Sequence, residues 1–239
     1  MKQFDIVGMK IYPYKNSNDL INKVDTSKGI LVALNFLKIC NASDKMKKIC
    51  EDHFAYADGI LAVNAIKKYN VNVSKIPGCE LWIEIIEKFL NQKSFYLIGG
   101  TNNVIENTVE KLRNNYKEIN IVGWKNGYFK KNEEELLIND LLLKKPDIVF
   151  VAMGSPKQEY LMEKLFTKHE ALYQGLGGSF DLYINNTKRA PTFFLQTGLE
   201  GFYRFITQPS RMIGLLKILK KKNFYLLIKF FLKKQEVKK

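Results

Sequence analysis

Short apolar runs alternate along the chain with segments whose apolar residues recur at helical spacing. The run from Phe95 to Ile98 leads into two glycines, whereas Leu81, Ile85 and Phe89 recur at every fourth position. Strands are predicted at 30–35, 95–100, 119–122, 147–153 and 171–176, and helices at 41–53, 60–69, 81–90, 103–116, 133–143 and 156–166. This alternation predicts an α/β fold with a largely parallel sheet flanked by helices.

The carboxyl ends of the predicted strands share one property, which is that they carry small or polar residues. These positions are Asn35, Gly99, Gly100, Gly154, Ser155, Gly177 and Gly178. In open parallel sheets, ligands bind outside the carboxyl ends of the strands. The pattern therefore predicts a single crevice lined by accessible backbone.

Two glycine turns bear on the kind of ligand. Gly99 and Gly100 stand between a strand and a helix, where glycine lets a phosphate approach backbone N–H groups, although an ordinary tight turn has the same sequence. The run from Gly175 to Phe180 is not a dinucleotide fingerprint, because Phe180 occupies the place of the third glycine. Without that fingerprint, a nicotinamide-dependent oxidoreductase is disfavoured, and the chain has no P-loop either.

The segment GSPKQE, residues 154–159, is the most unusual of these turns. Ser155 is expected to cap the next helix, with Pro156 in its first position. Lys157 would then lie at a helix N-terminus, where a positive charge is mildly unfavourable. A residue that departs from a local preference beside a predicted ligand site is a candidate for function.

Two aspartates follow small-residue turns. Asp58, in Ala57-Asp58-Gly59, could act as a general base, but a turn aspartate that bonds to its own backbone is commoner, and spacing alone favours that interpretation. The same ambiguity holds for Asp181. The chain contains no Asp-x-Asp pair, so a sugar-nucleotide enzyme that uses this metal-binding motif is disfavoured.

Cysteine and histidine are scarce. Cys40, Cys50 and Cys79 form no close-spaced metal pattern, and their odd number favours a reducing compartment. The two histidines argue against a histidine-based zinc site. No segment resembles a secretory signal or approaches the roughly 18 apolar residues that cross a bilayer, so a cytoplasmic protein is expected.

Charge is unevenly distributed along the chain. From Arg204 to Lys239 there are eleven basic residues and a single acid, Glu236, so this segment carries +10 of the net charge of +14. The preceding residues are close to neutral, and a hydrophobic content of 46% argues against disorder. Residues 202–232 mix aromatic and aliphatic side chains with lysines, which is typical of basic amphipathic helices on an anionic membrane. A helix packed on the body with a solvated lysine face, or a nucleic-acid-binding segment, would have a similar composition.

An ordered series of motifs between about residues 30 and 215 resembles the WecG/TagA/CpsF family of bacterial glycosyltransferases. The motifs are Ala57-Asp58-Gly59, Leu97-Ile98-Gly99-Gly100, Val122-Gly123, Asn126-Gly127-Tyr128-Phe129, Pro146-Asp147, Gly154-Ser155-Pro156-Lys157-Gln158-Glu159, Gly177-Gly178-Ser179-Phe180-Asp181, Lys188-Arg189-Ala190-Pro191, Gly198-Leu199-Glu200, Tyr203-Arg204 and Gln208-Pro209-Ser210-Arg211. A single motif of this kind would be weak, but the ordered series is highly specific.

The resemblance implies an inverting, metal-independent enzyme without a cofactor. Such an enzyme moves a hexose from a UDP-sugar to a polyprenyl-diphosphate-linked sugar at the inner face of the cytoplasmic membrane, in bacterial surface polysaccharide synthesis. Donors in the family include N-acetylmannosamine and its uronic acid. It also implies a Rossmann-like core, expected at 1–200, and a basic helical appendage, expected at 201–239, that associates with the membrane. A polyprenyl-linked acceptor lies in the membrane, so a membrane surface is favoured over nucleic acid as the partner of residues 202–239. The resemblance also implies that the chain can self-associate into a homo-oligomer.

Residue roles follow from the same resemblance. Asp58 becomes the expected base, which reverses the interpretation from spacing alone, and Arg204 and Arg211 are expected to stabilise the departing UDP. The expected nucleotide-sugar contacts are Asn35, Gly99, Gly100, Gly154, Ser155, Gln158, Gly177, Gly178 and Asp181.

Three positions depart from the family pattern. Ala33 stands where a threonine is usual, Glu80 where an aspartate is usual, and Gly214 where a third arginine is usual, with Lys217 as an imperfect substitute. These departures bear on the donor sugar, and they keep a catalytically inactive basic binding protein of the same fold as the alternative.

Overall fold

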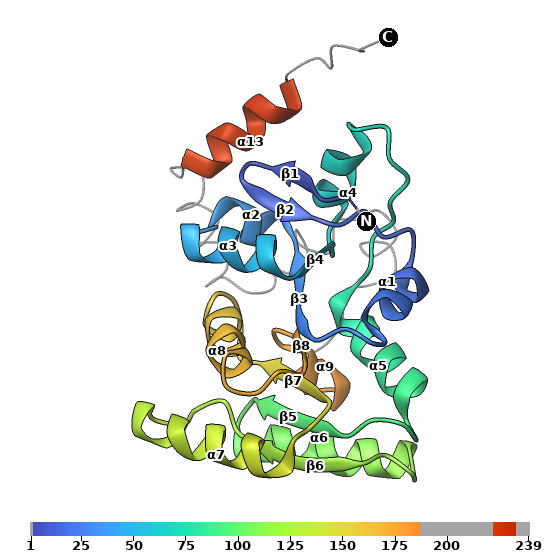
Figure 1. The fold of residues 1–239 in the computed structure, drawn as a ribbon, viewed down its shortest axis with the longest axis vertical. Coiled ribbons are helices and arrows are strands. Elements are labelled where there is room, and N and C mark those ends of the chain that lie inside the picture. Colours follow the sequence, from blue (N-terminus) through green and yellow to red (C-terminus); the bar gives the residue numbers. More distant parts are fainter. Residues whose placement is uncertain (1, 187–221, 233–239) are drawn as a thin grey trace. The chain divides into compact units, whose positions relative to one another are not determined.

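The computed structural model describes residues 2–186 and 222–232, which form two compact units (Figure 1). One unit, here called unit 1, comprises Met1–Asn16, Leu34–Ile76 and Arg189–Lys239, and the other, unit 2, comprises Ser17–Ala33 and Pro77–Lys188. The expected boundary near residue 200 lies outside the described residues. In the described ranges, no helix has both the length and the apolar character that crossing a bilayer requires.

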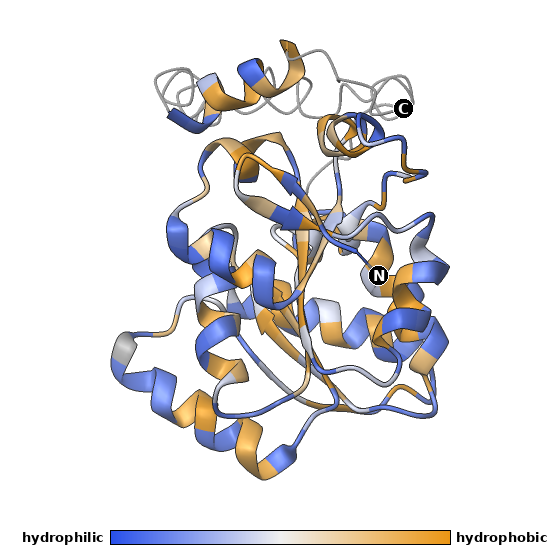
Figure 2. Ribbon diagram, turned by 45° about the horizontal axis from the view of Figure 1, so that its top comes forward, coloured by the Kyte–Doolittle hydropathy of each residue, from blue (hydrophilic) through white to orange (hydrophobic). Residues whose placement is uncertain are grey.

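The backbone forms the α/β architecture that the hydrophobic pattern predicts. A six-stranded sheet has the order β4-β3-β8-β7-β5-β6, and the four strand pairs from β3 to β6 are parallel. Its strands are β3 (Gly29–Leu34), β4 (Phe54–Ala57), β5 (Phe95–Gly99), β6 (Ile121–Lys125), β7 (Ile148–Ala152) and β8 (Leu172–Gly175). Hydrophobic residues are concentrated along the central strands (Figure 2). These strands, β3, β5, β7 and β8, are buried along their whole length.

In unit 2, helices alternate with the strands along the chain, and several of them pack against the sheet. They are α1 (Ser17–Val24), α5 (Gly78–Phe89), α6 (Asn102–Asn115), η1 (Lys131–Glu133), α7 (Glu134–Lys144), α8 (Lys157–Phe166) and α9 (Ser179–Tyr183). Trp82 of α5 lies edge-on to Phe150 and Phe180, with ring centroids 5.7 and 5.6 Å apart, and so joins the helix layer to β7 and α9. α6 begins at a threonine cap, since the Thr101 hydroxyl accepts a hydrogen bond from the N–H of Val104 at 3.3 Å.

The strand register brings the glycine turns of unit 2 to one edge of the sheet. Gly99 of β5 pairs with Ala152 of β7, and Val151 of β7 pairs with Gly175 of β8. The turns that follow these three neighbouring strands therefore lie beside one another. The glycine turns are therefore neighbours, as the sequence predicts for one sheet edge, and a crevice between them stays a prediction.

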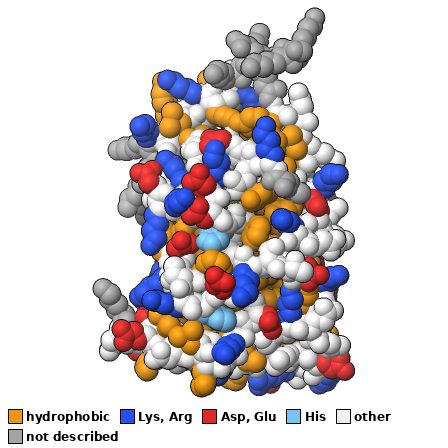
Figure 3. All heavy atoms as spheres, viewed as in Figure 1, with side chains coloured by type: hydrophobic (Ala, Val, Ile, Leu, Met, Phe, Trp, Pro, Cys, Tyr) orange, Lys and Arg blue, Asp and Glu red, His pale blue; other side chains and the backbone are white. Residues whose placement is uncertain are grey.

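Unit 1 contains elements that the sequence pattern did not predict. They are the antiparallel pair β1 (Phe4–Ile6) and β2 (Met9–Ile11), the short helix α2 (Phe36–Cys40) and strand β4, and they accompany α3 (Asp44–Asp52), α4 (Ile60–Lys67) and α13 (Lys222–Leu232). The predicted helix at 41–53 is shorter than expected, because the Ser43 side chain caps α3 through the N–H of Met46 at 3.1 Å. On the face shown in Figure 3, basic and acidic side chains are interspersed.

Candidate functional site

The turns after β7 and β8 are held together by one side chain. Gly154 and Gly177 have φ angles of +78° and +62°, which glycine adopts without strain. The carbonyl oxygen Oε1 of Gln158 accepts a hydrogen bond from the N–H of Gly154 at 3.1 Å and from that of Gly177 at 2.9 Å. Gln158 is only 1% exposed. The segment 154–159 therefore supplies a buried side chain that fixes the turns after β7 and β8 relative to each other.

The start of α8 differs from the sequence expectation. The helix begins at Lys157, its N-cap is Pro156, and no side chain caps it, so Ser155 is not the cap and Pro156 is not the first helical residue. The Ser155–Pro156 peptide bond is cis. Ser155 is exposed instead, next to the open side of the turn.

The backbone of these two turns faces open space. A Cβ atom built on Gly154, Gly177 or Gly178 would meet no other heavy atom within 4 Å. Ser155 and Gly178 are exposed. Such a surface lets a ligand come into direct contact with the main chain, where the N–H groups are strong hydrogen-bond donors.

Gly99 and Gly100 have a different reason to be glycine. A Cβ on Gly99 would collide with the carbonyl oxygen of Ala152, and one on Gly100 would lie 2.6 Å from Cγ1 of Val104. Close packing against the neighbouring strand and helix therefore accounts for glycine at both positions, as expected for an ordinary tight turn. Ligand contact at these positions stays a prediction.

The loop after β6 belongs to the same edge, although sequence reasoning assigned it no role in the site. The N–H of Gly127 donates to the carbonyl oxygen of Gly100 at 2.8 Å, and the ammonium group of Lys157 donates to the carbonyl oxygen of Gly127 at 3.3 Å. Lys157, unfavourable by its position in the helix, thus fixes this loop. The motif Asn126-Gly127-Tyr128-Phe129 was the available signal.

In unit 1, Asn35 and Asp58 lie at the ends of neighbouring strands. Asp58 directly follows β4, and its N–H donates to the carbonyl oxygen of Leu34 at 3.0 Å. A Cβ on Gly59 would lie 3.5 Å from the Cα of Asn35, so the two segments touch. Asn35 caps α2, since its Oδ1 accepts from the N–H of Lys38 at 3.1 Å. Both residues are partly exposed.

The remaining predicted positions are placed as follows. Asp181 lies in the first turn of α9, is partly exposed, and accepts a hydrogen bond from Nδ2 of Asn186 at 2.8 Å. Ala33 is buried in β3, and Glu80 lies in the first turn of α5. Arg204, Arg211, Gly214 and Lys217 lie outside the described residues.

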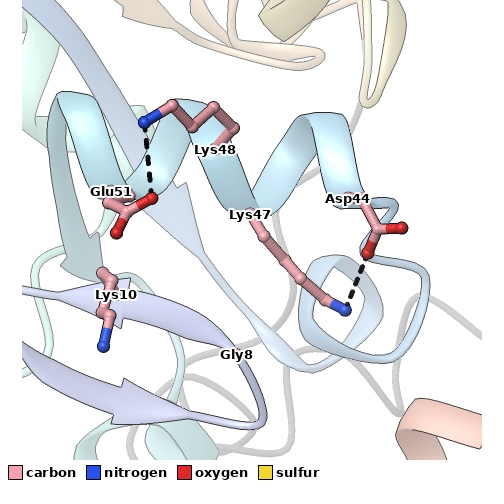
Figure 4. Close-up of a pocket in the computed structure, with 6 residues that line it drawn as sticks. All are labelled: Gly8, Lys10, Asp44, Lys47, Lys48 and Glu51. Atoms are coloured by element: carbon pink, nitrogen blue, oxygen red, sulfur yellow. Dashed lines mark hydrogen bonds and ion pairs between the residues drawn. The ribbon is translucent and has the colours of Figure 1, made fainter.

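A surface hollow of about 250 Å³ lies elsewhere in unit 1, between the β1–β2 pair and α3 (Figure 4). Its ammonium groups already have acidic partners: Lys47 with Asp44 at 3.1 Å, and Lys48 with Asp52 at 2.9 Å. Exposed pairs of this kind contribute little to stability or recognition. The hollow contains none of the predicted site residues.

The titratable residues that the structure describes include no group of three or more His, Cys, Asp or Glu that could hold a metal ion. The resemblance to a family of glycosyltransferases rests so far on motifs between about residues 30 and 215. Comparison with known families extends that resemblance over nearly the whole chain. The model of the glycosyl transferase WecG/TagA/CpsF family matches residues 4–238, and the chain belongs to this family.

Proposed function

We propose that the protein is an inverting, metal-independent glycosyltransferase that uses a UDP-sugar. The transferred hexose is N-acetylmannosamine, its uronic acid or a related sugar, and the acceptor is a sugar linked to polyprenyl diphosphate. Family membership supports transferase chemistry in surface polysaccharide synthesis. Nucleotide binding is supported by one observation: at the carboxyl edge of the sheet, the backbone of Gly154, Gly177 and Gly178 faces open space.

Asp58 is the proposed general base. Its place at the end of β4 fixes its backbone through the bond to Leu34, and its partial exposure lets an acceptor hydroxyl approach. A carboxylate that removes the hydroxyl proton as the new glycosidic bond forms is expected to contribute about 10²–10⁴ in rate. Asn35 caps α2 through Oδ1, which leaves its Nδ2 group to contact the donor.

The departing UDP accumulates negative charge as the bond to the sugar breaks. Backbone N–H groups at the strand ends of unit 2, together with Arg204 and Arg211, are proposed to stabilise that charge. Main-chain donors need no reorganisation, since the neighbouring hydrogen bonds at Gly154 and Gly177 already fix the turns.

Membrane association is proposed to involve α13. Leu227 is its one buried residue, whereas Tyr225, Ile228 and Leu232 on the opposite face are 60%, 40% and 76% exposed. Lys222 and Lys229, seven positions apart, both border one side of this exposed apolar face. An apolar strip bordered by lysines matches an anionic lipid surface, where each lysine contributes about 1 kcal/mol.

The direct test is UDP release by the full-length protein with a lipid-diphosphate-linked sugar acceptor and a panel of UDP-sugars. Release with one donor, unaffected by excess EDTA, is the expected result. Release that EDTA abolishes would contradict metal independence. UDP binding without release from any donor would favour the inactive binding protein, and failure to bind UDP at all would contradict the nucleotide site.

A further inference from the structure

The amide of Gln158 can be oriented in only one way that satisfies its surroundings. Its Oε1 faces two N–H donors, those of Gly154 and Gly177, and its Nε2 donates to the carboxylate of Glu159 at 3.0 Å. The reversed amide would direct two hydrogens at two N–H groups and an oxygen at a carboxylate. Glu159 therefore reinforces the amide orientation that the two N–H groups select.

Glu159 and Gly175 make room for this arrangement and orient it. Glu159 is fully buried, and a buried carboxylate is costly unless it accepts hydrogen bonds. A Cβ on Gly175 would lie 2.5 Å from Nε2 of Gln158, so the last residue of β8 has to be glycine for the side chain to fit. The sequence pattern alone assigned neither residue a role.

We infer that Gln158 joins the turn at Gly154 to the turn at Gly177 and does not contact the ligand; its two hydrogen bonds to these turns are here called the bracket. Glu159 and Gly175 are then positioning residues, which hold the Gln158 side chain in place. The N–H groups of Gly154 and Gly177 already donate to Gln158 and so do not bind a ligand in this arrangement. Ser155 and Gly178 are exposed residues, and within the described part of the chain their N–H groups have no hydrogen-bond partner. The inference rests on the proposed function and assigns these two N–H groups to the diphosphate of the nucleotide.

The hydrogen bonds themselves can be tested without any ligand. In protein labelled with ¹⁵N-glycine, the amide hydrogens of Gly154 and Gly177 are expected to exchange at least about tenfold more slowly than that of Gly178. Gln158→Glu removes the N–H that donates to Glu159 and places two carboxylates side by side. They repel each other when both ionise, so protection of both glycines is expected to fall at pH 8. Equal exchange of all three glycines in the unaltered protein would overturn the bracket.

A double variant that reverses the pair separates positioning from contact. Gln158→Glu with Glu159→Gln restores an acceptor for both glycine N–H groups and a donor between the two side chains. Protection and UDP affinity are expected to return to within about threefold of the unaltered protein. If protection returns while UDP binding stays at least about tenfold weaker, Gln158 contacts the ligand directly and the inference is wrong. Gln92→Glu, in the exposed turn that follows α5, controls for the added charge.

Loss of the hydrogen bonds at Gln158 and loss of the nucleotide site would be seen in different measurements. An unaltered protein that shows protected glycines but does not bind UDP would contradict the proposed function and leave the bracket intact. A protein that binds UDP equally well with and without Gln158→Glu, at the same pH and with the expected loss of protection, would contradict the positioning role. Thermal unfolding of each variant shows whether the altered chain is folded, so that affinity is compared between folded proteins only.

Discussion

The ammonium group of Lys68 donates a 2.7 Å hydrogen bond to the carbonyl oxygen of Phe230, in the last turn of α13. The same group donates to the carbonyl oxygen of Phe231 at 2.8 Å and lies 5.3 Å from the centre of the Phe230 ring. The final carbonyl groups of a helix lack helical partners and carry partial negative charge. A lysine at the end of α4 therefore holds the end of a helix more than 150 residues away in the sequence.

Replacement of Lys68 with methionine is expected to loosen α13. The change keeps most of the side-chain volume but removes charge-assisted hydrogen bonds whose net value is about 1.5–3 kcal/mol. Hydrogen exchange of residues 222–232 should accelerate about tenfold or more as a result. Lys67→Met is the matched control, because Lys67 is the exposed neighbour in the same helix. Equal exchange in both variants would show that other contacts hold α13.

The exposed face of α13 makes the membrane proposal testable. Ile228→Glu with Leu232→Glu places two anions on the apolar strip, so binding to vesicles that contain an anionic phospholipid should fall by about tenfold or more. Cosedimentation at low and high salt measures this loss. Leu143→Glu is the control, since Leu143 of α7 is 81% exposed and lies in unit 2. A comparable loss in the control variant would point to net charge rather than to this face.

Asp58→Asn should separate chemistry from binding. Asparagine keeps the size of the side chain but cannot take the acceptor proton, so sugar transfer should fall by about 10²–10⁴. UDP affinity should change little, and a titration with UDP checks this. Asp52→Asn, at the exposed end of α3, is expected to transfer at the normal rate. Transfer that survives in Asp58→Asn would remove this residue from the mechanism.

The three thiols should differ in reactivity. Cys40 and Cys50 are fully buried, whereas Cys79 is partly exposed in the first turn of α5. Burial raises the pKa of the Cys40 thiol to about 11, so at pH 8 this group is protonated and unreactive. Because the pKa is raised in the folded chain, its contribution to stability is complete at pH 8 and is lost only as the pH rises towards 11. An aromatic disulfide reagent at pH 8 should thus modify Cys79 first, and Cys79→Ser should abolish the fast phase.

The central strands could be predicted from the sequence because they are buried on both faces and read as continuous apolar runs. The predictions at 95–100, 147–153 and 171–176 correspond to β5, β7 and β8. β4 was missed because its four residues adjoin a segment with helical periodicity. Without β4, the sequence could not show that Asp58 stands at a strand end beside Asn35.

The bracket at Gln158 could not have been predicted, because it depends on which strands are neighbours. Gly154 and Gly177 are 23 positions apart in the chain and meet only because β7 pairs with β8. The glycines themselves also looked alike in the sequence. Their surroundings divide them into those that pack, such as Gly99 and Gly175, and those that face open space, such as Gly178.

This division predicts opposite consequences for two glycine-to-alanine changes. Gly178 has a φ angle of −102°, which alanine adopts readily, and its missing Cβ points into open space. Gly178→Ala should therefore leave the free energy of unfolding within about 0.5 kcal/mol of its original value. The new methyl group occupies the place where the nucleotide is proposed to approach, so UDP affinity should fall by at least about tenfold.

Gly99→Ala is the contrasting variant, because its methyl group would collide with the Ala152 carbonyl and its φ angle of +140° is unsuited to alanine. A loss of stability of about 1–3 kcal/mol is expected from strain and overpacking, measured by denaturant unfolding. If Gly178→Ala instead destabilises the fold and leaves UDP affinity unchanged, the turn after β8 is structural and does not face the nucleotide. If both variants retain full affinity and stability, the open edge of this sheet is not where UDP binds.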